Sequence, residues 1–196
     1  MTAKKYILLT LFFIIFLILS EDLFAQPNLS PKPAWLENGI IMAGNWEPLI
    51  FRTRRGHNLE EDYVERYKEE HTEETVIKLK KLGVNFVMTH AYKGFGLKAE
   101  KEDIEYAKIL AENCRKHGIR VGIYICGTFS FETLFLEEPR AKEWIRRDEN
   151  GKPIYHGGDQ TYRYRPNLFN KDFQEHRKNV VRILIKEIKP DLIHFD

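Results

Sequence analysis

The chain has 196 residues, with 31 Lys and Arg against 29 Asp and Glu, and a formal net charge of +2. Basic residues are interleaved with acidic ones and form no patch, which argues against a nucleic-acid partner. Aromatic residues make up 13% of the chain; aromatic faces stack on sugar rings, although packing accounts for most such residues in any protein.

The first 25 residues have the order of a secretory signal peptide. Lys4 and Lys5 precede an apolar run over 6–19, and Ala25 ends a short segment that suits cleavage. The run is shorter than the roughly 20 residues that a membrane span needs. We therefore expect a secreted or periplasmic protein with no membrane contact after cleavage. Leu23 at the −3 position leaves an uncleaved N-terminal anchor as the alternative.

Residues 26–38 are rich in proline and polar side chains, and we expect a linker there. The domain then spans 39–196. It opens with a short apolar run over 39–44 that suits a buried strand. The stretch 52–71 is highly charged, and it is predicted to be a surface loop with a helical piece.

A helix-then-strand unit follows and recurs along the chain. Thr72 is the predicted N-cap of a helix with an apolar stripe, Gly83 ends it, and a strand follows over 84–89. The second unit has its apolar helical face over 104–114, Gly118 as its stop, and a strand over 119–126. A third helix over 172–187 leads to a strand over 191–196.

Helices that alternate with short, continuously apolar strands predict a parallel α/β sheet. Period and order alone do not separate a doubly wound sheet from a barrel. No strand is followed by a Gly-rich phosphate loop, which argues against a nucleotide-binding sheet. A complete barrel has eight strands. We expect about four β/α units, the N-terminal half of a (β/α)8 TIM barrel in a truncated sequence.

The two cysteines, Cys114 and Cys126, fall in a predicted helix and in the strand after it. We favour two buried thiols over a disulfide, because free cysteine is among the most buried residue types. No Cys and His set has the spacing of a zinc site, and we expect neither a metal nor a cofactor.

Asp196 is the candidate catalytic residue. In parallel α/β architectures the active site lies at the carboxyl ends of the strands, and Asp196 directly follows the apolar run of the last one. An unpaired carboxylate among apolar neighbours is costly, so it must face a pocket or a partner. Glycoside hydrolysis needs two carboxylates, of which Asp196 would be one. The alternative is an aspartate that caps the next loop.

Other polar and aromatic residues are predicted to bind substrate because they lie at strand ends or in a loop that would line a cleft. At the strand ends these are Asn45, Trp46, Glu47, His90, Tyr92 and Tyr124. In the loop before the third helix they are Tyr164 and Asn167. Alternatives remain open: Glu47 in a salt bridge near Arg52, Trp46 in the core, and the loop as plain packed surface.

Three segments resemble, in order, parts of the alpha-L-fucosidases and related TIM-barrel glycoside hydrolases. They are 85–95 (NFVMTHAYKGF), 114–126 (CRKHGIRVGIYIC) and 186–196 (KEIKPDLIHFD). In those families an aspartate at a strand end is the nucleophile, and the resemblance places it on Asp196. The His-His-Asp-Gly-Phe run that fucosidases use to hold the sugar is here Ala91 to Phe95, of which only Gly-Phe remains. The broader glycosidase group therefore fits better than fucose specificity.

The sequence thus predicts a glycoside hydrolase, retaining in mechanism, that acts on carbohydrate outside the cytoplasm. The general acid would lie beyond Asp196, so the chain as given would be inactive. Two alternatives remain open. One is a catalytically silent carbohydrate-binding barrel, and the other is a metal-dependent hydrolase with His90, His194 and Asp196 as ligands.

Overall fold

The structure is a computed structural model that describes residues 31–54, 62–157 and 160–196. The predicted signal peptide and the first residues of the predicted linker lie outside the described residues. The chain divides into residues 1–39 and 40–196. In the first unit the described part contains one 3-10 turn, η1 (Ala34–Leu36). Among the residues that the structure describes, no helix has the length and apolar character that crossing a membrane requires.

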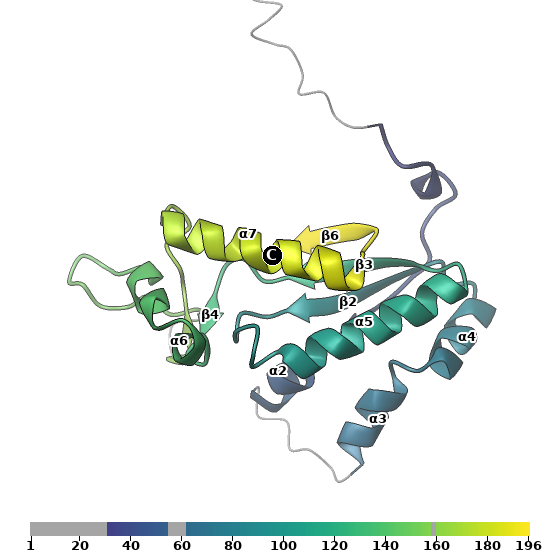
Figure 1. Cartoon of the computed structure of the whole chain (residues 1–196), viewed down its shortest axis with the longest axis horizontal. Helices are drawn as coiled ribbons and strands as arrows, with labels where there is room; N and C mark the ends of the chain where they lie inside the picture. Colours follow the sequence, from purple (N-terminus) through teal and green to yellow (C-terminus); the bar gives the residue numbers. More distant parts are fainter. Residues whose placement is uncertain (1–30, 55–61, 158–159) are drawn as a thin grey trace, which may run out of the picture. The chain divides into compact units, whose positions relative to one another are not determined.

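A four-stranded parallel sheet forms the centre of the second unit (Figure 1). Its strands, in spatial order, are β1 (Met42–Trp46), β2 (Phe86–Tyr92), β3 (Arg120–Ile125) and β6 (Leu192–Phe195). Each pair of neighbours is parallel. The four predicted strands are confirmed within a few residues of their predicted ends. The expectation that the first one is buried is wrong, because β1 lies at the edge of the sheet and Met42 is 59% exposed.

Three helices follow the predicted order along the chain. They are α4 (Glu73–Lys81), α5 (Lys101–Lys116) and α7 (Lys171–Ile188). The Thr72 side chain caps α4 by accepting a hydrogen bond from the Thr75 N–H, which satisfies one free donor of the first turn. Gly83 and Gly118 both have positive φ, +85° and +67°, which is the backbone conformation that ends helices at glycine.

These helices cover one face of the sheet, and the main core lies between the two layers. Leu110 of α5 and Leu184 of α7 are fully buried against Val121 and Ile123 of β3. Cys114 belongs to this core. Cys126 packs in a separate cluster that includes Phe129 and Phe131, and both thiols are free and buried, as predicted.

The charged stretch after β1 is more helical than predicted. It holds α2 (Leu49–Arg54) and α3 (Tyr63–Glu69), with residues 55–61 outside the described part of the chain. Tyr67 of α3 is buried, and its hydroxyl donates to the Asp103 carboxylate of α5 at 3.0 Å. Buried contacts of this kind hold α3 against α5, although the charged composition of the segment predicts a surface loop.

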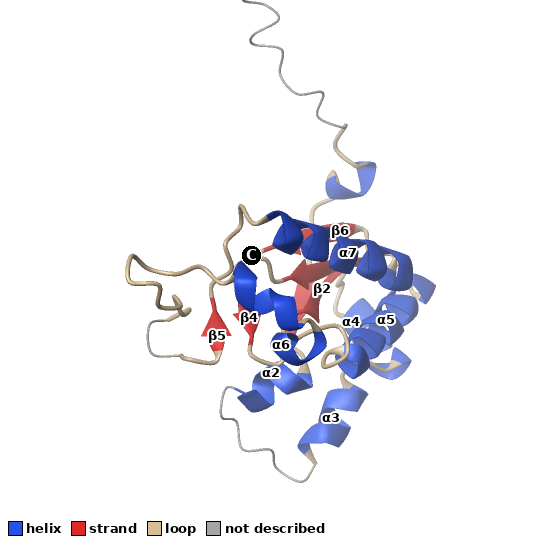
Figure 2. Ribbon diagram, turned by 60° about the vertical axis from the view of Figure 1, so that its left-hand side comes forward, coloured by secondary structure: helices blue, strands red, loops and turns tan. Residues whose placement is uncertain are grey.

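The long connection from β3 to α7 contains several short elements of secondary structure (Figure 2). Its elements are β4 (Ser130–Phe131), α6 (Leu134–Glu137), the 3-10 helix η2 (Pro139–Trp144) and β5 (Arg163–Tyr164). Strands β4 and β5 pair antiparallel. Strands of two residues leave too short a pattern for the sequence to predict.

Candidate functional site

An open depression of about 640 Å³ lies on the sheet face opposite the helices. Alternation along β2 and β3 explains its lining, because successive strand side chains point to opposite faces. Val87 and Val121 face the helical core, whereas Met88 and Tyr124 face the depression. Ten residues line it: Met42, Gly44, Asn45, Glu47, Met88, His90, Lys93, Tyr124, His194 and Asp196.

Asp196 stands directly after β6, on the wall of this depression. Its carboxylate accepts a hydrogen bond of 2.5 Å from the Tyr124 hydroxyl. Its backbone carbonyl accepts another from the Gly127 N–H at 2.8 Å, which ties the end of β6 to the loop after β3. The side-chain hydrogen bond joins Asp196 to the neighbouring strand β3.

Three rings stand side by side across three strands of this face. His90 of β2, Tyr124 of β3 and His194 of β6 occupy the same register. The His90 and Tyr124 rings stack with centroids 4.3 Å apart, and the Tyr124 and His194 rings are 5.7 Å apart. The row forms an aromatic floor beside Asp196.

His90 is only 8% exposed. Burial lowers the pKa of His90 to about 3, and the nearby Lys93 ammonium acts in the same direction. The imidazole is therefore neutral at neutral pH and has one donor and one acceptor nitrogen. Among the described residues, its buried Nδ1 has no hydrogen-bond partner.

Lys93 and Glu47 face each other in the depression, with Nζ 3.7 Å from Oε1. The Lys93 ammonium also lies over the rings of Phe51 and Tyr124, at 4.1 and 4.5 Å from their centroids. Burial lowers the pKa of Lys93, and Glu47 opposes that shift. Among the described residues, the Glu47 carboxylate pairs with Lys93. The alternative of a salt bridge in the basic stretch that begins at Arg52 falls partly outside the described part of the chain.

A bulge at the end of β1 decides which of its side chains enter the depression. The register shifts between Gly44 and Trp46, and Asn45 between them has a φ of +79°. Asn45 and Glu47 consequently both line the depression. Trp46 points the other way, packs against the main core, and donates from its indole to the Glu70 carbonyl at 3.1 Å. In the structure Trp46 therefore packs against the core and does not line the depression.

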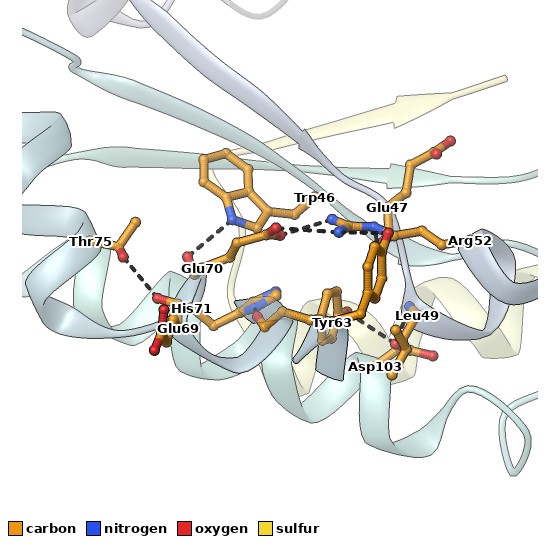
Figure 3. Close-up of polar contacts among 11 residues, drawn as sticks. Trp46, Glu47, Leu49, Arg52, Tyr63, Glu69, Glu70, His71, Thr75 and Asp103 are labelled. Carbon is orange, nitrogen blue, oxygen red and sulfur yellow. Dashed lines mark hydrogen bonds and ion pairs between the residues drawn. The ribbon is translucent and has the colours of Figure 1, made fainter. Parts of the chain in front are cut away.

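Behind Glu47, a polar network holds the backbone of the β1–α2 turn (Figure 3). Arg52 donates from Nε to the Glu47 carbonyl at 2.9 Å and from both terminal nitrogens to the Glu70 carboxylate at 3.3 and 2.9 Å. Asp103 accepts from the Leu49 N–H at 2.8 Å. The Glu47 side chain points away from this network in Figure 3. The network therefore positions the backbone of the β1–α2 turn. The Glu47 side chain lies outside the network and lines the depression.

Replacing Arg52 by glutamine should lower the free energy of unfolding by about 1–3 kcal/mol, because the Glu70 carboxylate and the Glu47 carbonyl lose their donor. Urea denaturation measures this. Arg140→Gln is the matched control, since Arg140 pairs with Glu138 on the surface with a 68% exposed side chain; we expect at most about 1 kcal/mol there. Equal losses in both variants would contradict the positioning role of Arg52.

A buried carboxyl group shapes the loop that carries Lys93. Glu100 is fully buried, and it accepts hydrogen bonds from the backbone N–H groups of Lys93 at 2.6 Å and Phe95 at 2.7 Å. Gly94 between them has a φ of +94°, and a Cβ there would lie 2.8 Å from the Phe129 carbonyl oxygen. Only glycine fits such a backbone. Glu100 and Gly94 together hold Lys93 at the depression.

Burial raises the pKa of Glu100 from its ordinary 4.5 to about 8, although the two backbone N–H groups oppose that shift. Between these pH values the folded protein keeps a proton that the unfolded chain has released, so the free energy of unfolding falls as pH rises, by at most about 1.4 kcal/mol per pH unit. The stability advantage of wild type over Glu100→Gln should therefore shrink from about pH 5 to pH 8.

Urea denaturation of both proteins across this range provides the measurement, with Glu112→Gln as the control on an exposed position of the same helix. A difference between wild type and Glu100→Gln that stays constant with pH would show that Glu100 is already ionised in the folded protein at pH 5.

Tyr92 lies on the helix side of the sheet, not in the depression. Simple alternation puts it on the same face as His90, but the β2 register shifts between the two residues. Tyr92 is buried in the main core, and its hydroxyl lies 3.3 Å from the His176 ring of α7. The bulge is the physical reason that Tyr92, predicted to bind substrate, faces the helices and not the depression.

Tyr164 and Asn167 also lie away from the depression. The Tyr164 ring of β5 packs against Phe135 and Tyr155, with centroids 4.9 and 5.1 Å apart. Asn167 shapes a turn: its N–H donates to the Trp144 carbonyl at 2.6 Å, and its side chain accepts from the Phe169 N–H at 3.1 Å. Tyr164 is packed in the loop, whereas Asn167 lines a second depression, of about 610 Å³, beside Arg146 and Phe169.

The predicted set omitted several residues of the depression. Lys93 follows a strand end, which is a usable signal, but a lysine is most often a surface residue. His194 lies two residues before Asp196, and strand alternation places it on the same face. His90, His194 and Asp196 share the depression; within the described ranges, no group of three or more His, Cys, Asp or Glu side chains is arranged to hold a metal ion.

No protein-family model and no curated protein matches this sequence. Solved structures do resemble it in fold. An alpha-galactosidase from Lactobacillus brevis aligns at 13% identity over 80% of this chain and 20% of its own, with a TM-score of 0.54. A maltogenic alpha-amylase from Thermotoga neapolitana aligns at 16% identity over 82% of this chain and 39% of its own, with a TM-score of 0.52. An alpha-galactosidase from Thermus thermophilus, in complex with p-nitrophenyl alpha-D-galactopyranoside, aligns at 16% identity over 85% of this chain and 31% of its own. Its TM-score is also 0.52.

At these identities the likeness concerns the fold alone. The chain spans between a fifth and two fifths of the length of these enzymes. Their parallel strands and covering helices belong to TIM-barrel glycosidases, a broader group than the fucosidases that the sequence resembles. The described part of this chain has the α/β fold of half a (β/α)8 barrel.

Proposed function

We propose that the protein is a retaining glycoside hydrolase that acts on carbohydrate outside the cytoplasm, with Asp196 as its nucleophile. The observation that carries the proposal is the place of Asp196. It stands at the carboxyl end of a parallel strand, in a depression that the neighbouring strand ends line, and it accepts a hydrogen bond from Tyr124. This is the end of the sheet at which barrel enzymes hold their active sites.

In the proposed reaction, the Asp196 carboxylate forms a bond to the anomeric carbon while the bond from that carbon to the leaving oxygen breaks. The leaving oxygen takes a proton from a general acid, for which we assign no described residue. Water then hydrolyses the glycosyl ester and releases the sugar with its original configuration.

The other lining residues suit a sugar. The ring row of His90, Tyr124 and His194 offers an aromatic floor, and sugar rings present C–H groups to such faces. Asn45, Glu47 and Lys93 add an amide, a carboxylate and an ammonium to the lining of the depression, and these groups can donate to and accept from hydroxyl groups. The alpha-amylase and alpha-galactosidases of similar fold support the carbohydrate class but not a particular sugar.

The test is to incubate the full-length protein with a panel of p-nitrophenyl glycosides and oligosaccharides. Release of nitrophenol or of reducing sugar, with a product of retained configuration by NMR at early times, supports the proposal. Sugar binding without hydrolysis would instead favour a catalytically silent carbohydrate-binding barrel. Hydrolysis with inverted configuration would contradict the role of Asp196 as nucleophile.

A further inference from the structure

We infer that the second depression, which Asn167 lines, is a binding site for a sugar unit that carries a carboxylate, a uronic acid. It measures about 610 Å³, and its lining comes from the segments 143–147 and 166–169 in the long connection from β3 to α7. Among the described residues, it shares no lining residue with the depression that holds Asp196. The sugar class of the ligand rests on the proposed function, whereas the acidic group is inferred from the lining side chains.

Backbone hydrogen bonds join the two lining segments. The Arg146 N–H donates to the Arg165 carbonyl at 2.8 Å, and the Asn167 N–H donates to the Trp144 carbonyl at 2.6 Å. Trp144 is buried, so the second of these bonds also ties the segments to the interior. A ligand therefore meets walls that are already joined, and binding does not have to order them.

Phe169 places an aromatic ring at the surface, on a turn that several hydrogen bonds hold. The residue is 89% exposed, and Leu168 before it is 45% exposed. The Phe169 N–H donates to the Asn167 side chain at 3.1 Å, and the Gln174 side chain donates to the Leu168 carbonyl at 2.9 Å. Two adjacent apolar side chains with polar groups around them suit a binding surface. The C–H face of a sugar ring is a suitable partner for the Phe169 ring.

The charged groups of the lining are mainly positive. Arg146 and Arg147 line the depression together with one carboxyl group, that of Glu143. Arg147 donates to the Gly151 carbonyl at 2.9 Å, and this neutral acceptor does not compensate the charge of the guanidinium. A guanidinium group binds a carboxylate through two parallel N–H bonds, so both arginines suit an acidic group on the ligand.

A uronic acid unit satisfies three kinds of lining group at once. Its ring face stacks on Phe169, its carboxylate pairs with the arginines, and its hydroxyl groups bind Asn167. The Asn167 side-chain oxygen already accepts the Phe169 N–H, which leaves its NH2 group to donate to a hydroxyl. A neutral sugar leaves the excess positive charge unmatched, and an acidic peptide has no sugar ring to stack on Phe169.

The experiment measures, by calorimetric titration, how the full-length protein binds oligosaccharides of galacturonate, glucuronate, mannuronate and guluronate, and their methyl esters. The ester keeps the sugar rings but removes the charge. Wild type should bind at least one acid form about tenfold more tightly than its ester. The double variant with Arg146→Gln and Arg147→Gln should lose that preference, and Phe169→Ala should weaken both forms about fivefold. Arg66→Gln on α3, where the side chain is 50% exposed, is the matched control and should bind as wild type does.

Equal affinity for acid and ester across the panel would overturn the inference. So would a preference that persists in the double variant with wild-type circular dichroism. Should the double variant fail to fold, the two single variants replace it, and an unchanged preference in both would have the same meaning. Binding of an oligoglutamate peptide that depends on the same arginines, without binding of any uronic acid, would overturn the inference in favour of an acidic protein partner.

The same panel separates this inference from the proposed function. A preference for uronic acids in a protein that hydrolyses no glycoside would contradict the proposed function but not the second binding site. Hydrolysis of glycosides without any preference for the acid forms would contradict the second site alone.

Discussion

In the full-length protein, replacing Asp196 by asparagine is expected to lower glycosidase turnover by about three orders of magnitude or more, with sugar binding largely intact. The amide has nearly the same shape as the carboxylate, so the depression keeps its lining. It is a much poorer nucleophile, and losses of this size are typical when a residue that forms the covalent intermediate is removed. Steady-state kinetics and calorimetric titration with the same sugar measure the two effects separately.

Asp191→Asn is the matched control for this change. Asp191 lies just before the same strand and accepts hydrogen bonds from Arg120 and from the Val121 N–H, at 2.8 and 2.9 Å, at the opposite end of β6. Its variant should lose some stability and keep its turnover. Undiminished turnover in Asp196→Asn would exclude this residue as the nucleophile.

Replacing Leu184 by alanine is expected to lower the free energy of unfolding by about 2–5 kcal/mol, which exceeds the effect of the other stability changes considered. Leu184 of α7 has no exposed surface and belongs to the core between helices and sheet. Its truncation removes apolar contacts and leaves a cavity that neighbouring side chains fill only in part. Urea denaturation followed by circular dichroism gives the value.

Leu136→Ala is the corresponding control, since Leu136 of α6 is 84% exposed. The same three carbons are removed there, and the expected change is within about 0.5 kcal/mol. A loss at Leu184 no larger than the loss at Leu136 would contradict the packing of α7 against the sheet, and with it the arrangement that places β6 beside β3.

The layered fold was predictable because its signals are local. Thr72 before an acidic first turn, and Gly83 and Gly118 after apolar stripes, mark helix ends through hydrogen bonds and backbone conformations that depend on nearby residues only. The apolar runs of β2 and β3 follow from their central place in the sheet, where most of their residues are buried. The position of Asp196 at the carboxyl end of β6 was predictable from the strand pattern, whereas its catalytic role is a proposal.

Side-chain direction near the ends of β1 and β2 was not predictable. One extra residue in a strand reverses which face the following side chains meet, and the bulges at Asn45 and after His90 send Trp46 and Tyr92 to the helices. A bulge has no reliable signature in a single sequence. Glu100 was hidden for a different reason: it sits in a charged run, and only the folded loop shows that it accepts two backbone N–H groups.

The most direct test of the account is to trap the intermediate on Asp196. The protein is treated with a panel of activated fluoro-glycosides, which form the glycosyl ester but hydrolyse slowly, and its peptides are analysed by mass spectrometry. The account predicts one added fluoro-sugar on the Asp196 side chain, and none in Asp196→Asn. A stable sugar adduct on a different residue, in protein that hydrolyses the parent glycoside, would contradict it.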